Sequence, residues 1–166
     1  MPVATLNVRR TVIGGISGGA AMTLLGVVVR ALGVAMNAEA MLGTMFTMPD
    51  RGAWIIGFAM HMVLAILFAL VYAWGFENIT HRAGFLVGLG FAVVHIIVAG
   101  VAMAMIPAVH PMIPERMMAP GAFMAGMGAI GVGLFILEHL MYGAIVGAVY
   151  GPVRRQVGPG VALNVG

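Results

Sequence analysis

The 166-residue sequence contains no cysteine and no lysine, and only 8% of its residues are charged. Without cysteine, the chain forms neither disulfides nor thiolate metal sites, and it has no cysteine nucleophile. A soluble globular domain carries about 25% charged residues, so a chain that is 62% hydrophobic and 8% charged belongs to another class. These absences predict an integral membrane protein, in agreement with the mean hydropathy of +1.09.

The sequence also lacks the motifs of common catalytic and nucleotide-binding sites. It has no glycine loop followed by lysine, no G-x-S-x-G and no H-E-x-x-H, because Glu138-His139 lacks the second histidine. The net charge of +3 comes from arginines at helix ends and not from a basic patch, so nucleic-acid binding is not expected. Polar residues within the apolar runs are too few to line a water-filled ion path. We therefore expect neither an enzyme nor a channel.

Four apolar runs are long enough to cross a bilayer, which takes roughly 20 helical residues. We predict a single all-α membrane domain, residues 1–166, built as a four-transmembrane-helix bundle with spans at about 11–34, 53–76, 83–106 and 123–150. Residues 35–52 are too polar to cross again, and their methionines predict a short amphipathic piece at the membrane interface. The prolines after the third span predict a loop there.

Arginines are distributed unequally between the two sides of this bundle. The side with both termini carries five arginines: Arg9, Arg10, Arg82, Arg154 and Arg155. The opposite side carries two, Arg51 and Arg116. Cytoplasmic loops carry an excess of basic residues, so both termini are expected in the cytoplasm. Arg30, near the outer end of the first span, can reach outward toward Glu39 or Glu115.

Small residues recur at helical spacing along every span. Such stripes let a neighbouring helix approach closely. The glycines that we expect at helix–helix contacts are Gly15, Gly19, Gly26, Gly57, Gly88, Gly143 and Gly147.

Three histidines lie inside the spans: His61 in the second, His95 in the third and His139 in the fourth. Counted from the cytoplasmic ends at 1.5 Å per residue, all three lie roughly 18–23 Å up, within about one helical turn of each other. Each also lies on the small-residue face of its helix, which suits burial because a lipid-facing histidine is costly. We therefore predict one midplane site, with Glu138 or a methionine as a possible further partner. Glu138, about 100° around the helix from His139, is expected to face another direction.

Several interpretations of this histidine set remain open. Two histidines at one depth can hold a b-type haem axially, and three imidazoles can instead bind copper or zinc. The histidines can equally serve only as hydrogen-bonding groups between helices. The cofactor is therefore left open between b-type haem, copper and none.

Most of the 16 methionines cluster toward the outer side of the bundle. His110, Met112, Met117 and Met118 form a candidate thioether and imidazole surface for Cu(I). Methionine is also a flexible apolar filler of irregular loops, and the absence of an M-x-x-M-x-x-M repeat favours that interpretation.

Three segments resemble a group of small bacterial four-span membrane proteins. They are AEAMLGTMF at 38–46, the pattern from His61 to FALVYAW at 68–74, and EHLMYGAIVGAVYG at 138–151. The resemblance covers nearly the whole chain. It implies a four-helix bundle in the bacterial inner membrane and assigns no site residue.

Our first function hypothesis is a non-catalytic accessory or structural subunit of a larger inner-membrane complex of respiratory or photosynthetic type. Its warrant is the combination of glycine stripes for close packing with the absence of a catalytic motif. Membrane lipids and other membrane protein subunits are then the expected partners. The alternatives are a b-type haem electron carrier that uses the midplane histidines and a copper-handling protein with a Met/His-rich outer face.

Overall fold

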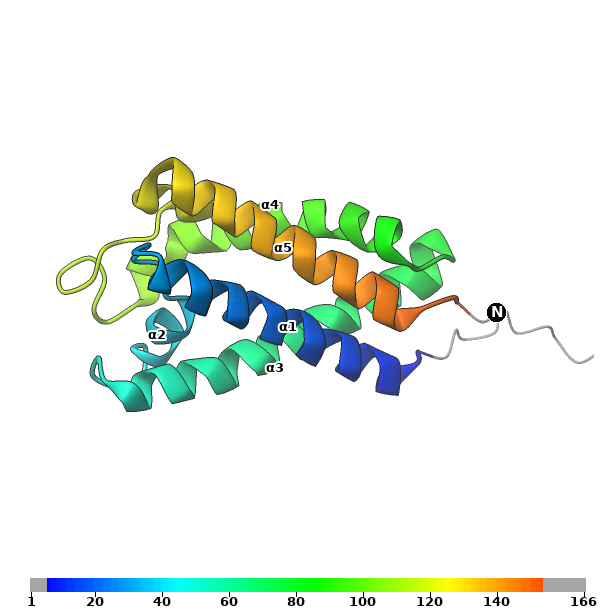
Figure 1. The fold of residues 1–166 in the computed structure, drawn as a ribbon, viewed down its shortest axis with the longest axis horizontal. Coiled ribbons are helices and arrows are strands. Elements are labelled where there is room, and N and C mark those ends of the chain that lie inside the picture. Colours follow the sequence, from blue (N-terminus) through cyan, green and yellow to red (C-terminus); the bar gives the residue numbers. More distant parts are fainter. Residues whose placement is uncertain (1–5, 154–166) are drawn as a thin grey trace, which may run out of the picture.

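The computed structural model describes residues 6–153, and every regular element in that part of the chain is helical. Four long helices form the bundle in Figure 1: α1 (Val8–Ala31), α3 (Arg51–Gly75), α4 (Phe85–Val109) and α5 (Gly128–Tyr150). Three short elements join them: α2 (Ala38–Gly43), a π-helical turn η1 (Phe76–Thr80) and a 3-10 turn η2 (Ala122–Met127). The all-α prediction is confirmed for the described residues.

The outside of the bundle is apolar along all four long helices. Each of them, α3 together with η1 and α5 together with η2, is long and apolar enough to cross a membrane. Leu24, Leu67 and Val94 are 65%, 52% and 61% exposed, and in a bilayer these side chains contact lipid instead of water. By length and composition, the chain has the four helices of a multi-pass membrane protein.

The helix ends differ from the predicted spans by a few residues, for local reasons. α1 begins at Val8 because the Asn7 side chain accepts a hydrogen bond from the backbone N of Arg10 at 3.2 Å, which caps the helix. Asp50 caps α3 in the same way, accepting from Ala53 N at 2.8 Å. α4 continues through Pro107 to Val109, so this proline lies within the helix and the predicted loop begins later.

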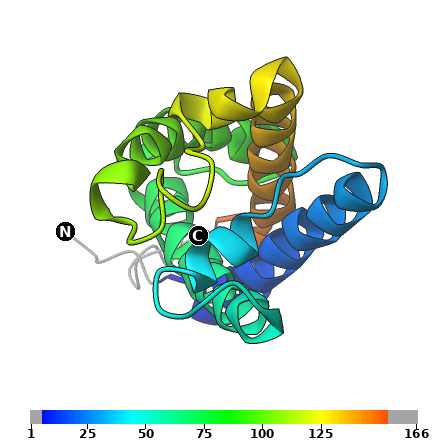
Figure 2. The same cartoon turned by 90° about the vertical axis from the view of Figure 1, so that its left-hand side faces the viewer.

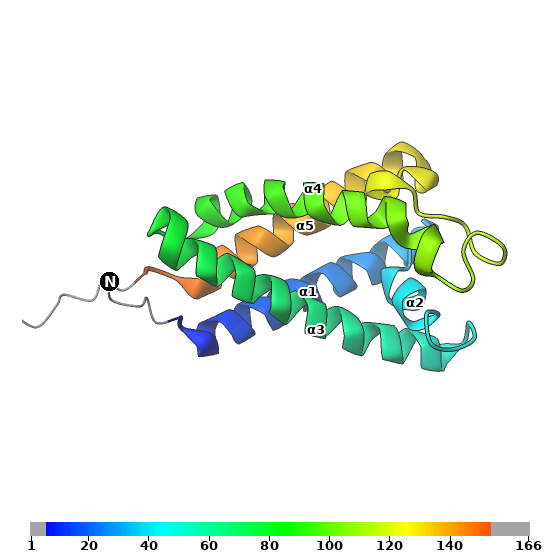
Figure 3. The same cartoon turned by 180° about the vertical axis from the view of Figure 1, so that it is seen from behind.

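Around the bundle, the helices follow the order α3, α1, α5, α4. α1 packs against α3 and α5, and α5 packs against α4. α3 and α4 are consecutive, yet they are not among the closely packed pairs, and Figure 3 shows them from their own side. Near the turn that joins them they meet through aromatic rings, with Phe91 5.6 Å from Tyr72 and 5.1 Å from Phe76. The contact between α3 and α4 is therefore made by side chains and not by close packing of the two backbones.

The other helix contacts depend on glycine. A Cβ at Gly88 would collide with the carbonyl oxygen of Gly143, so α4 and α5 touch backbone to backbone. On α1, a Cβ at Gly15 would lie 2.9 Å from the carbonyl oxygen of Ala65 in α3. Of the other expected packing glycines, Gly19 faces α3, Gly57 faces α2 and Gly147 faces the start of α4.

The polar piece between α1 and α3 packs against the long helices at one end of the bundle. α2 packs against α3, where Gly57 leaves room for the Glu39 backbone. Glu39 and Met41 on α2 are buried. Figure 2 looks at the bundle from this end, with α2 among the ends of the long helices. α2 therefore closes this end of the bundle.

At the opposite end, Tyr150 ties the first and last helices together. Its hydroxyl donates to Glu77 in η1 at 2.5 Å and accepts from the backbone N of Asn7 at 3.3 Å. The Arg10 guanidinium donates to the Tyr150 carbonyl at 3.1 Å. The start of α1 and the end of α5 therefore lie at the same end of the bundle, as Figure 1 shows.

Candidate functional site

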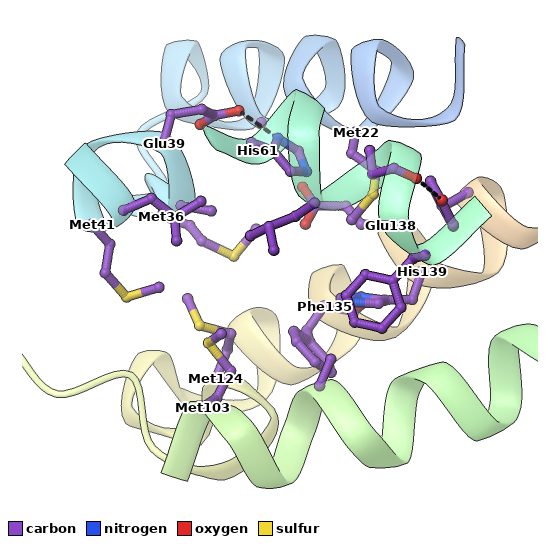
Figure 4. A pocket seen from close by; sticks show the side chains of 18 of the residues that line it. Met22, Met36, Glu39, Met41, His61, Met103, Met124, Phe135, Glu138 and His139 are labelled. Atoms are coloured by element: carbon purple, nitrogen blue, oxygen red, sulfur yellow. Dashed lines mark hydrogen bonds and ion pairs between the residues drawn. The ribbon is translucent and has the colours of Figure 1, made fainter. Parts of the chain in front are cut away.

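A cavity of about 160 Å³ lies inside the bundle, in the half that α2 closes. All four long helices and α2 contribute to its wall, which Figure 4 shows from close by. Most of the wall is apolar, with thioether groups from Met22, Met36, Met41, Met103 and Met124. An engineered apolar cavity of about 150 Å³ binds benzene, so this cavity has room for a group of about one ring.

The three span histidines all line this cavity. His61 comes from α3, His95 from α4 and His139 from α5. The rings of His95 and His139 are 4.8 Å apart between centroids and nearly perpendicular. The structure thus brings the predicted residues together at one place.

Hydrogen bonds fix the orientation of each ring. His139 Nδ1 donates to the carbonyl oxygen of Phe135 one turn earlier, at 2.7 Å, which leaves its Nε2 as a lone-pair acceptor. His95 Nδ1 lies 3.3 Å from the Tyr72 hydroxyl. His61 Nδ1 lies 3.2 Å from the Thr23 hydroxyl of α1. The histidines therefore also connect helices.

Arg30 and Glu39 form an ion pair at the α2 end of the cavity. Arg30 Nη1 lies 3.4 Å from Glu39 Oε2 and donates to the Met36 carbonyl at 3.2 Å, so the arginine turns toward Glu39 and not outward to Glu115. Glu39 Oε1 lies 3.7 Å from His61 Nδ1. Burial raises the pKa of the Glu39 carboxyl, but hydrogen bonding from His61 and the backbone outweighs burial and lowers it to about 2. Glu39 is therefore ionised at neutral pH.

Glu138 is the carboxyl in the cavity that has no such partner. Its side chain is 8% exposed and lines the cavity, and no hydrogen bond or ion pair within residues 6–153 involves its carboxyl group. Gly26 of α1 has no side chain, which leaves space next to the Glu138 carboxyl. A Cβ at Gly26 would lie 3.9 Å from Glu138 Oε1 and 3.3 Å from Arg30 Nη1. Gly26 thus borders the cavity instead of a helix contact.

The direction of Glu138 corrects the expectation that it faces away from the histidine site. α5 packs between α1 and α4, and the cavity extends along both sides of it. Glu138 points to the α1 side, near Gly26, while His139 points to the α4 side, near His95. A step of about 100° around the helix therefore still leaves both side chains in one cavity.

The side of the cavity between α3 and α4 is made of side chains alone. Leu64 and Phe68 of α3 and Ala99 and Met103 of α4 form it. Leu64 lines the cavity and is 38% exposed. If the long helices cross a bilayer, this side of the cavity faces the lipid chains.

His95 and His139, taken as a pair, do not suit the axial ligation of a b-type haem. Two axial imidazoles lie on opposite faces of the porphyrin, whereas the rings of His95 and His139 are 4.8 Å apart and perpendicular, with Phe68 stacked on His95 at 4.0 Å. No macrocycle fits between them in this geometry. Among residues 6–153, no group of three or more histidine or acidic side chains is placed to hold a metal ion.

The candidate copper residues lie at the α2 end, outside the cavity. His110 is buried, and both of its ring nitrogens form hydrogen bonds: Nδ1 accepts from Met112 N at 3.1 Å and Nε2 donates to the Met41 carbonyl at 2.9 Å. Met117 Sδ accepts from the Thr44 hydroxyl at 3.4 Å, while Met118 is 61% exposed. Because both imidazole nitrogens are engaged, this histidine fastens the loop to α2.

Sequence reasoning missed the aromatic part of the site. Phe135 and Tyr142 line the cavity together with Glu138 and His139. They lie one helical turn from these residues, and that spacing was the available signal. No protein-family model, curated protein or solved structure matches this chain.

Proposed function

We propose that this chain is a multi-pass protein of the bacterial inner membrane that binds a small, largely apolar molecule in the cavity between its helices. The observation that carries the proposal is the Glu138 carboxyl, which lines the cavity without a protein partner among the described residues. The Glu138 carboxyl borders the cavity space, so a ligand there can supply the hydrogen-bond partner that the described residues do not. Mostly apolar walls with a few placed polar groups are typical of small-molecule sites.

The position of the cavity supports a ligand that arrives through the bilayer. Its α3–α4 side consists of Leu64, Phe68, Ala99 and Met103, without a backbone contact between the helices. Side chains change rotamers far faster than packed helices separate. A molecule dissolved in the lipid chains can therefore enter by displacing side chains.

The arginines support an orientation with both termini in the cytoplasm. Arg9, Arg10 and Arg82 lie at the end of the bundle where α1 begins and α5 ends. Arg51 and Arg116 lie at the other end, whereas Arg154 and Arg155 fall outside the described residues. An excess of basic residues is typical of the cytoplasmic side, and in this proposed orientation the α2 end and its cavity lie in the outer half of the membrane.

The binding proposal is tested by filling the cavity. 2-Phenylethanol, a neutral one-ring molecule, is titrated calorimetrically into the purified protein in detergent, with protein-free micelles as the reference. We expect saturable binding to the wild-type protein and its loss in Ala99→Phe, whose new ring occupies the cavity. Ala104→Phe is the matched control, because Ala104 is exposed on the same helix. Equal, non-saturating uptake by all three proteins would overturn the proposal.

A second candidate is the accessory-subunit function, and one observation favours it. Gly90 on α4 and Gly133 on α5 are exposed, and a Cβ at either position would meet nothing within 4 Å. Glycine weakens a helix by about 1 kcal/mol relative to alanine, and close approach by a helix of another protein would account for its presence there. Purification from native membranes in mild detergent should then yield a larger complex that Gly133→Leu disrupts and Ile130→Leu does not. A solitary monomer would count against this function.

A further inference from the structure

We propose that the ligand of the cavity is a lipophilic organic cation: a protonated amine whose apolar body is about the size of one ring, with Glu138 as its counter-ion. This inference rests on the proposed binding function and adds the chemical class of the ligand. Its basis is the charge balance of the cavity, the direction of its free hydrogen-bonding groups and the composition of its wall.

The charges that line the cavity balance only when Glu138 holds a proton or meets a positively charged ligand. Arg30 carries one positive charge, and Glu39 and Glu138 supply two carboxyls. Arg30 is paired with Glu39 at 3.4 Å, which leaves the Glu138 carboxylate uncompensated when the three imidazoles are neutral. A carboxylate in apolar surroundings is stable only with a partner of opposite charge or with a proton. A cationic ligand completes the balance, whereas an anionic one would add repulsion.

The cavity offers free hydrogen-bond acceptors from two residues of α5. Both oxygens of the ionised Glu138 carboxylate accept, and so does Nε2 of His139, because its Nδ1 donates to the Phe135 carbonyl. Nη1 of Arg30 donates to Glu39 and to the Met36 carbonyl. The acceptors of Glu138 and His139 suit a ligand that donates hydrogen bonds. A protonated amine both donates hydrogen bonds and carries the required charge.

The rest of the wall suits the apolar part of such a ligand. Phe68, Phe135 and Tyr142 line the cavity, and aromatic faces attract an organic cation through their negative π-surface. The methionine side chains adapt to the shape of an apolar body. A hydrated inorganic ion finds too few oxygen ligands here to replace its water.

The test compares two molecules with the same carbon skeleton at neutral pH. 2-Phenylethylammonium carries the charge and donors, and 2-phenylethanol is its neutral counterpart. Binding of each to the full-length protein is measured by calorimetry in detergent against protein-free micelles. We expect the ammonium to bind at least about tenfold more tightly than the alcohol, as one charged hydrogen bond predicts.

The Glu138→Gln variant should weaken ammonium binding by roughly 10- to 100-fold and leave alcohol binding within about threefold of wild type. Glu115→Gln is the matched control, because Glu115 is exposed and lies outside the cavity wall. It should change neither affinity. Retained alcohol binding also reports that the Glu138→Gln protein is folded.

Equal affinities of the two molecules for the wild-type protein would overturn the cation proposal and leave the binding function intact. This comparison uses only the wild-type protein, so it tests the cation proposal even if the Glu138→Gln variant does not fold. An unchanged preference for the ammonium in a folded Glu138→Gln protein would also overturn it. Absence of saturable binding by either molecule would remove the binding function and the cation proposal together.

Discussion

Glu138 and His139 are adjacent in sequence and line one cavity from the two sides of α5, Glu138 toward Gly26 of α1 and His139 toward His95 of α4. Glu138 contributes a carboxyl without a hydrogen-bond partner among the described residues. His139 contributes an imidazole whose proton position is set by the Phe135 carbonyl of the same helix. The carboxyl and the imidazole can be tested in separate experiments.

The tautomer of His139 is a direct prediction of this geometry. Its Nδ1 faces the Phe135 carbonyl at 2.7 Å, and a carbonyl only accepts, so the proton must lie on Nδ1. His110 gives the opposite case, because its Nδ1 accepts from Met112 N and its proton must lie on Nε2. Nitrogen-15 NMR of the histidine rings at neutral pH should show one tautomer of each kind for these two residues. An Nε2 proton on His139 would contradict the described geometry.

A glycine pair on α4 tests the backbone contact with α5. Gly88→Leu should destabilise the protein by at least about 1–3 kcal/mol, because the side chain would force the two helices apart. Gly90→Leu, two residues away on the open face of the same helix, should be neutral or stabilise by up to about 1 kcal/mol. Thermal unfolding in detergent, followed by circular dichroism, measures both. Similar losses in the two variants would show that α4 and α5 are packed differently.

Glu39 gives the bundle a dependence on acid. The pKa of its carboxyl falls from an ordinary value of 4.5 to about 2 in the folded protein. Because the folded-state pKa is the lower one, its stabilising contribution is present above pH 4.5 and is lost as the pH falls toward 2. Melting temperatures between these pH values should decline more steeply for the wild type than for Glu39→Gln.

The matched control for this acid effect is Glu115→Gln, an exposed carboxyl in the loop after α4. Its profile should follow the wild type. At neutral pH the Glu39→Gln protein should be the less stable one, because Arg30 loses its charged partner. Parallel profiles of Glu39→Gln and wild type would mean that the carboxyl does not hold α2 in place.

His110 should act as a fastening between the loop after α4 and α2. His110→Ala removes the hydrogen bonds to Met41 and Met112 and leaves buried groups unpaired, which should destabilise the contact by about 1–3 kcal/mol. Hydrogen exchange of residues 38–47 and 110–117 should accelerate. Met118→Ala, in the same loop but exposed, should leave exchange unchanged. If His110→Ala instead changes only copper binding, the fastening role is wrong.

The sequence alone was sufficient to predict four helices long enough to span a membrane and the common depth of the three span histidines. Long apolar runs predict spans because a bilayer fixes the helix length, and counting along His61, His95 and His139 gave their common level because the helix rise is constant. The direction of Glu138 could not be obtained in this way. A helical wheel gives the angle between two side chains, but the cavity exists only where α1 and α4 flank α5.

The packing of α2 against α3 could not be predicted from the sequence either, because it also depends on which residues lie next to α2 in the fold. Its methionines and its glutamate read equally well as an interfacial helix, because both environments have an apolar side and a polar side. What decides is the partner: Arg30, nine residues earlier, forms the ion pair that holds Glu39 inside the bundle. The stretch through Pro107 also stayed helical, since the neighbouring helices compensate for a missing backbone hydrogen bond.

The order of helices around the bundle has a consequence for how the protein is made. α4 packs closely on α5 and its preceding turn η2, and hardly on α3, so among the described elements its partner is the last to leave the ribosome. α1 and α3, in contrast, can pair as soon as both have been inserted. If the helices enter a membrane in chain order, we therefore expect assembly in two stages, an early α1–α2–α3 unit and a late closure by α5. The cavity, with Glu138 and His139 on that final helix, comes into existence only at the second stage.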